Sequence, residues 1–141
     1  MKIIEIVNAY KVLGEIQVYN LEDDEILKIL NARIEMKQHV DKYNSFLEDA
    51  KDKCKPSDYD EKSTLMQDWS ELDEPTRKEL NTWLRSYNNK INSLVKTFAE
   101  QEVELNIEKL GPTTAVKLLK ANSWQPNKLD DISFILCQET N

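Results

Sequence analysis

Glycine and proline are scarce in this chain, which has two glycines and four prolines among its 141 residues. Residues of these two kinds mark turns and loops, so their scarcity indicates that most of the chain is helical. The two isolated glycines, Gly14 and Gly111, also cannot form a glycine-rich phosphate loop. The composition therefore predicts a mainly α protein.

Long apolar runs are missing as well. No stretch of about 18 consecutive apolar residues, the length that spans a bilayer, occurs in the chain. Near the N-terminus, Glu5, Lys11 and Glu15 interrupt the apolar residues, which argues against a signal peptide. We therefore expect a soluble protein of the cytoplasm with no membrane partner.

Side chains that commonly carry chemistry are few. His39 is the one histidine, whereas a zinc site needs three or four protein ligands and a nucleophilic serine or cysteine needs a base. The two thiols, Cys54 and Cys137, are well separated, and Cys54 falls within an apolar pattern where a free cysteine packs like a small apolar residue. We therefore predict no metal site, no cofactor, no enzymatic activity and a reducing compartment.

The charge balance is acidic. The formal net charge is -7, and the excess of acids is concentrated between residues 20 and 61. Such a surface repels phosphate backbones within a Debye length, so sequence-independent DNA or RNA binding is disfavoured. This leaves a protein partner or a small nucleotide ligand.

Two stretches keep an apolar heptad with alternating spacings of four and three. Their residues are, in the first stretch, Met36, Val40, Tyr43, Leu47, Ala50 and Cys54 and, in the second, Leu80, Leu84, Tyr87, Ile91, Leu94 and Phe98. This spacing lays a narrow apolar seam along a helix for another helix to cover. The pattern predicts a long antiparallel helical hairpin, and because the seams offer more apolar edge than one hairpin needs, it also predicts a homo-oligomer, most simply a dimer.

The length fits a single helical domain over 1–141. We expect the segments to be an N-terminal amphipathic helix within 1–20, a long helix over 21–55, a connector with a short helix over 56–74, a second long helix over 75–101, and a possible strand with helical pieces over 102–141.

The possible strand follows the second long helix. From Glu102 to Glu108 polar and apolar residues alternate, which places Val103, Leu105 and Ile107 on one face of an extended segment. A strand cannot stand alone, so these three residues are a candidate interface with a second subunit or with a target peptide.

Two short helical pieces are expected after Pro112, over 113–121 and 126–137. They resemble a helix-turn-helix in outline, but Asp130 and Asp131 would meet phosphates early in the recognition helix. Packing of these pieces against the hairpin is the preferred interpretation.

The most suggestive cluster lies on the second long helix. Its residues are Trp83, Arg85, Tyr87, Asn89 and Lys90. A base could stack on the two aromatic rings while Arg85 or Lys90 meets a phosphate, which makes the cluster a candidate ligand or partner site. The preferred interpretation is structural: Trp83 and Tyr87 pack beneath the N-terminal helix or beneath the short helix that contains Trp69.

Two segments of the C-terminal half stand out: Glu-Val-Glu-Leu-Asn-Ile-Glu-Lys-Leu from Glu102 to Leu110, and Leu-Asp-Asp-Ile-Ser-Phe-Ile-Leu from Leu129 to Leu136. With these segments the C-terminal half resembles a family of small tailed-phage or prophage proteins of unknown function. The long-helix N-terminal part is similar as well, whereas the region of Trp69 and Trp83 departs from the pattern. The resemblance implies a phage accessory protein and supplies no catalytic residues.

Two functions fit this interpretation. The first is a non-enzymatic accessory protein in the host cell cytoplasm that binds and neutralises a host factor, either a defence protein or a signalling nucleotide. The alternative is a virion structural or assembly component, such as a chaperone or connector. Small size and acidity are compatible with both.

Overall fold

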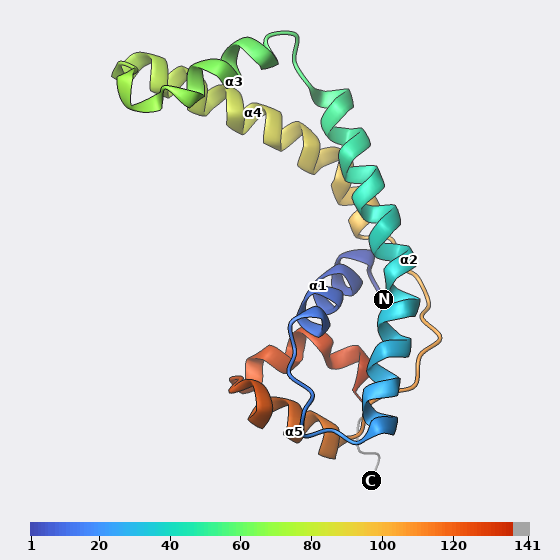
Figure 1. Cartoon of the computed structure of the whole chain (residues 1–141). Helices are drawn as coiled ribbons and strands as arrows, with labels where there is room; N and C mark the ends of the chain where they lie inside the picture. The colour runs from blue at the N-terminus through green and yellow to red at the C-terminus, as the bar shows by residue number, and fades with distance from the viewer. Residues whose placement is uncertain (137–141) are drawn as a thin grey trace. The chain divides into compact units, whose positions relative to one another are not determined.

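The computed structural model describes residues 1–136, and within them the chain is mainly helical (Figure 1). The elements are α1 (Ile3–Gly14), α2 (Asp23–Cys54), α3 (Tyr59–Gln67), the 3-10 turn η1 (Trp69–Glu71), α4 (Glu74–Ala99), α5 (Pro112–Asn122) and the 3-10 segment η2 (Pro126–Ile135). The predicted mainly α fold is confirmed. Among the described residues no helix has the length and apolar character needed to cross a membrane.

The chain divides into two compact units. Unit 1 comprises Met1–Tyr43 together with the chain from Ala99 onward, and unit 2 comprises Asn44–Phe98. The long helix α2 contributes to both, because its residues up to Tyr43 belong to unit 1 and the rest to unit 2.

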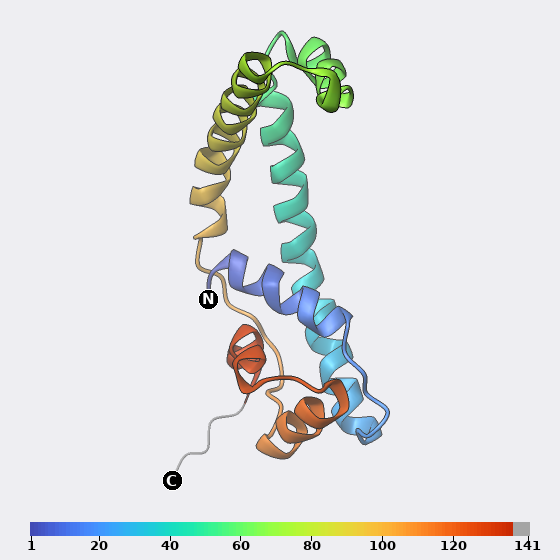
Figure 2. The same cartoon turned by 90° about the vertical axis from the view of Figure 1, so that its left-hand side faces the viewer.

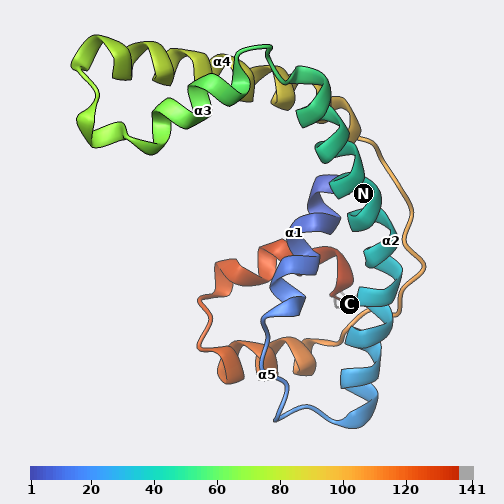
Figure 3. The ribbon, with the colours of Figure 1, turned by 45° about the horizontal axis from the view of Figure 1, so that its top comes forward.

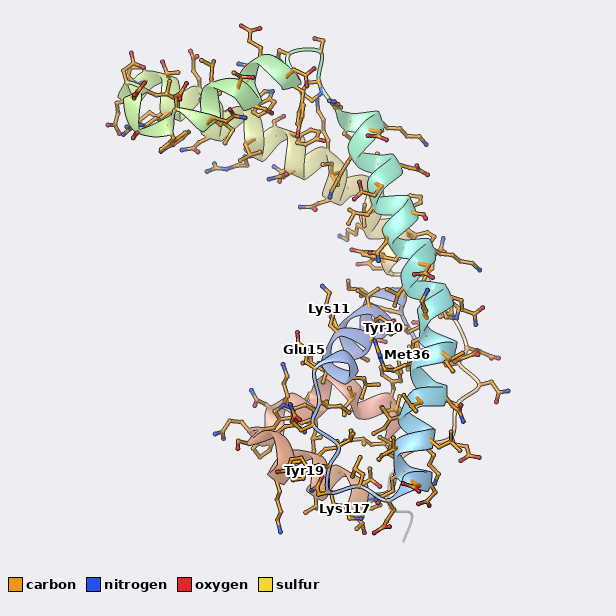
Figure 4. The ribbon with its side chains drawn as sticks, viewed as in Figure 1. Tyr10, Lys11, Glu15, Tyr19, Met36 and Lys117 are labelled. Atoms are coloured by element: carbon orange, nitrogen blue, oxygen red, sulfur yellow. The ribbon has the colours of Figure 1, made fainter. Side chains whose placement is uncertain are left out.

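Unit 1 has a well-buried apolar core. α1 is amphipathic, as predicted, and its buried residues are Ile3, Ile6, Val7, Ala9, Val12 and Leu13. α1 lies across the first part of α2 (Figure 2). Ile29 and Met36 in this part of α2 are buried. Tyr10 and Met36 lie between the two helices (Figure 4). The Arg33 guanidinium carbon lies 4.4 Å from the centre of the Tyr10 ring.

Hydrogen bonds tie the connection between α1 and α2 to helix α5. The backbone N–H of Gln17 donates to Asn122 Oδ1 at 2.7 Å, and Asn122 Nδ2 donates to the Gln17 carbonyl at 3.2 Å. Asn20 Nδ2 donates to the Lys117 carbonyl at 2.9 Å. These contacts fix the loop together with its buried Leu21 and its half-buried Ile16 and Val18.

The segment after α4 is extended, as the alternation predicts, but the predicted strand over 103–107 does not form a ladder. Figure 3 shows it as an extended trace from the end of α4 to the start of α5. Isolated bridges occur at its two ends, between Lys2 and Glu102 and between Leu110 and Leu136. Between them the apolar residues are half-buried and the polar ones exposed, so packing against unit 1 takes the place of strand pairing.

Unit 2 contains the helical hairpin. The rings of Phe46 and Phe98 stack with centroids 4.7 Å apart, and the Tyr87 hydroxyl donates to the Lys51 carbonyl at 3.0 Å. Because the residue numbers rise along α2 as those of their partners fall along α4, the two helices run antiparallel here.

The second apolar seam differs from its predicted heptad. Leu94 is 45% exposed, whereas the neighbouring Val95 is buried beside Ile91. An α-helix has 3.6 residues per turn rather than 3.5, so a straight helix shifts its buried side away from a strict heptad. Among the first-seam residues, Met36 and Val40 serve the core of unit 1 instead of the hairpin.

Candidate functional site

The five predicted residues on α4 fall into two groups, the aromatic pair Trp83 and Tyr87 and three polar residues. Trp83 and Tyr87 are four residues apart and stack with their ring planes 9° from parallel and their centroids 6.3 Å apart. The Tyr59 ring of α3 lies 6.0 Å from Trp83 and 5.6 Å from Tyr87. We call these three residues the aromatic cluster, and it joins α3 to α4.

Within the aromatic cluster, Tyr87 and Trp83 differ in whether their polar group has a hydrogen-bond partner within residues 1–136. Tyr87 uses its hydroxyl to donate to α2, and burial raises the pKa of this phenol above its ordinary value. The Trp83 Nε1 atom is buried and finds no acceptor in the described part of the chain. A buried donor without an acceptor costs about 1–3 kcal/mol, so Trp83 is the weak point of the cluster.

The other predicted residues line an open groove along α4. The groove measures about 760 Å³, and its walls are Lys53, Cys54, Thr82, Arg85, Ser86, Asn89, Lys90, Ser93 and Leu94. We call it the α4 groove. The structure thus brings Arg85, Asn89 and Lys90 together and places Trp83 and Tyr87 outside this lining.

The lining of the α4 groove combines cations and neutral polar groups with the apolar side chains of Cys54 and Leu94, and it contains no carboxylate. Lys53, Arg85 and Lys90 supply positive charge, and within residues 1–136 none of the three forms an ion pair with an acid. Hydroxyls and an amide stand between them. Such a surface can donate several hydrogen bonds to an anion, and phosphate oxygens are acceptors of this kind.

Sequence reasoning missed part of this lining. Lys53 and Cys54 come from α2, and their approach to α4 depends on the register of the hairpin. Thr82, Ser86, Asn89 and Ser93 recur along α4 at spacings of three and four, so a search for small polar residues on one helical face would have found them.

A second polar site lies in unit 1 and was not predicted. Glu25 accepts a hydrogen bond from Lys117 Nζ at 2.7 Å and another from the Thr114 hydroxyl. The bond from the Lys117 ammonium, joined by that from Thr114, lowers the pKa of Glu25 to about 2. The same pairing raises the pKa of Lys117. This carboxylate therefore acts as a charged link between α2 and α5.

The remaining candidates lie elsewhere. Val103, Leu105 and Ile107 are half-buried in the extended part of unit 1. His39 is half-exposed on α2, and no group of three or more metal-binding side chains occurs within the described part of the chain. Cys137, and with it the end of the helical piece expected over 126–137, lies outside the described residues.

Comparison of the chain with protein-family models, with curated proteins and with solved structures found no match.

Proposed function

We propose that this protein is a non-enzymatic binding protein of the phage accessory kind, which captures a phosphate-bearing small molecule such as a signalling nucleotide in the α4 groove. The observation that carries the proposal is the lining of the groove, where three cations without acidic partners stand among neutral hydrogen-bond donors. Sequestering such a ligand would neutralise a host factor in the host cell cytoplasm.

The negative charge of the whole chain makes local contacts in the groove more important for binding an anion. At -7 the protein as a whole repels anions, so an anionic ligand gains affinity here through local contacts. Lys53, Arg85 and Lys90 are local to one groove, and hydrogen bonds between ionised groups and phosphate are about twice as strong as neutral ones.

The aromatic cluster supplies a second element of recognition. Thr82 lines the α4 groove and also a smaller hollow whose other lining residues are Trp83, Lys62, Lys78 and Glu79. A ligand with a phosphate in the groove can therefore extend a base toward the indole of Trp83, and base stacking on aromatic rings is a common binding contribution.

The test is calorimetric titration of the intact protein with ATP, cyclic AMP and a cyclic dinucleotide. We expect at least one to bind, and the double variant Arg85→Gln, Lys90→Gln to bind it more than tenfold less tightly, since a hydrogen bond to a charged group contributes about 1.5–3 kcal/mol. Lys96→Gln removes an exposed base of α4 outside the groove and is the matched control. Absence of binding, or equal loss in the control, would count against the proposal.

The second candidate is a virion or assembly component. Exposed apolar side chains on α2, namely Leu27, Leu30 and Ile34, favour it, because assembly proteins work through contacts with other chains. Genomic position separates the two candidates, since a gene among capsid and tail genes indicates assembly and one among early accessory genes indicates host antagonism.

A further inference from the structure

Helix α2 carries an apolar stripe on the side opposite its buried residues. Leu27, Leu30 and Ile34 are 56%, 50% and 71% exposed. At about 100° per residue these three side chains fall within about 60° of one another, whereas Ile29 and Met36 point to the far side of the helix. We call Leu27, Leu30 and Ile34 the α2 stripe, and all of it belongs to unit 1.

Opposite charges stand at the two ends of the α2 stripe. Asp23 lies one turn before Leu27 on the same face, and Lys37 lies three residues after Ile34. Both ends are open to solvent, since Asp23 is exposed and the Lys37 side chain is 61% exposed while it donates to Asp41 at 2.7 Å. In the direction of the chain this face therefore carries the acidic Asp23, then the three apolar residues, and then Lys37 together with its acidic partner Asp41.

A shallow hollow borders the α2 stripe. It measures about 270 Å³ and is lined by Tyr10, Leu30, Arg33, Ile34 and Lys37. An apolar side chain from another surface can enter it between Leu30 and Ile34. The stripe is thus a shaped surface with room for a partner's side chain.

We propose that the α2 stripe is an interface with a second copy of this chain, packed antiparallel. If Leu30 faces its own counterpart, each residue faces the residue of the second copy whose number brings the total of the two to about 60. Ile34 then lies across from the partner subunit's Leu27, and Lys37 reaches the partner subunit's Asp23. The pattern is self-complementary under a two-fold axis: the contact of Ile34 with the partner subunit's Leu27 and the ion pair of Lys37 with the partner subunit's Asp23 each occur twice, whereas Leu30 meets its own counterpart once, on the axis.

The charge pattern selects this orientation and this occupant. A parallel pair would set Lys37 beside Lys37 and Asp23 beside Asp23, and like charges at an interface are unfavourable. The α2 stripe also differs from the two apolar heptad seams, because Met36 of the first seam is fully buried inside unit 1. None of the three stripe residues belongs to the buried core or to the lining of the α4 groove.

Sedimentation equilibrium on the full chain tests the interface. We expect the unchanged protein to be a dimer and Ile34→Asp to weaken the dimer at least about 100-fold, because two buried isoleucines are replaced by charges. Val116→Asp is the matched control, since Val116 is 48% exposed on α5, and it should remain dimeric. Circular dichroism checks that both variants keep their helices. A monomeric unchanged protein, or a dimer that Ile34→Asp leaves intact, would overturn the proposal.

Two further measurements test the orientation. Lys37→Glu should weaken the dimer, and adding Asp23→Lys should restore it by exchanging the two charges; failure of this rescue counts against the antiparallel pairing. The second measurement uses spin labels on Lys42→Cys, with both native cysteines replaced by serine. Residue 42 lies 12 positions after Leu30 on each copy, so in the antiparallel dimer the two labels should be about 36 Å apart along the helix axes. A separation near the spacing of adjacent helices would indicate a parallel dimer and overturn the proposal.

Discussion

The two units are stabilised by different kinds of contact. Unit 2 contributes Ala50, Leu80, Ile91 and Val95 to the buried apolar residues, and unit 1 contributes all the others among the described residues. Unit 2 relies instead on half-buried rings, such as the Phe46 and Phe98 stack and the aromatic cluster. Burial in an apolar core excludes water more completely than ring contacts at a surface, so unit 1 should be the more stable part.

The two units also differ in how the chain builds them. Unit 1 joins segments far apart in the sequence, as in the bonds between Gln17 and Asn122, whereas unit 2 is one continuous stretch. Contacts between residues close in sequence form quickly. They also open without breaking many contacts in other parts of the chain, because few distant segments depend on them. The candidate ligand site therefore lies in the unit that we expect to open more readily.

The largest effect is expected in the core of unit 1. Leu118→Ala should lower the free energy of unfolding by about 2–5 kcal/mol, because Leu118 is fully buried and its loss leaves a cavity. Urea unfolding followed by circular dichroism measures it. Val116→Ala on the same helix is the control and should change the free energy by less than about 0.5 kcal/mol. Equal effects would contradict the core assigned to α5.

A smaller effect is expected in the hairpin of unit 2. Phe46→Ala should cost about 1–3 kcal/mol, since the ring is stacked but only half-buried. Native-state hydrogen exchange should show faster opening of amides in 44–98 and unchanged amides in α5. Leu94→Ala on the exposed side of α4 is the control. If α5 amides respond equally, the two units unfold as one and the contrast between them is lost.

The charged link in unit 1 predicts a pH dependence. Because the folded protein keeps Glu25 ionised to lower pH than the unfolded chain does, this carboxylate stabilises the fold above the ordinary glutamate pKa and loses that contribution as the pH falls toward about 2. Glu25→Gln should be less stable than the unchanged protein near neutral pH, and the difference should shrink across this window. Urea unfolding at several pH values measures it, with exposed Glu15→Gln as control. A difference that stays constant with pH would contradict the link.

Much of the fold could be predicted because local signals mark the helix ends. The acidic first turn and Pro56 bracket the second predicted helix, expected over 21–55 and observed as Asp23–Cys54. The next long helix, expected over 75–101, is observed as Glu74–Ala99. In both cases the signal lies within a few residues of the boundary that it sets.

What could not be predicted depends on contacts between distant segments. The exposure of Leu94 in place of Val95 depends on how α4 meets α2, and the pairing of Glu25 with Lys117 joins residues that no local pattern connects. The candidate site divides in the same way. Arg85, Asn89 and Lys90 were visible on one helix, whereas Lys53 enters the groove through the register of the hairpin.

The smallest effect is expected from the hydrogen bond that joins Tyr87 of α4 to Lys51 of α2. Tyr87→Phe removes the donation from the hydroxyl to the Lys51 carbonyl while it keeps the ring in the aromatic cluster. We expect a loss of about 0.5–1.5 kcal/mol, the usual net contribution of one hydrogen bond, confined in hydrogen exchange to unit 2. Tyr19→Phe, on a side chain that is 78% exposed, provides the matched control and should have no measurable effect. If Tyr87→Phe matches that control, ring packing alone holds α4 against the end of α2, and the contrast between a core-stabilised unit and a ring-stabilised unit becomes sharper.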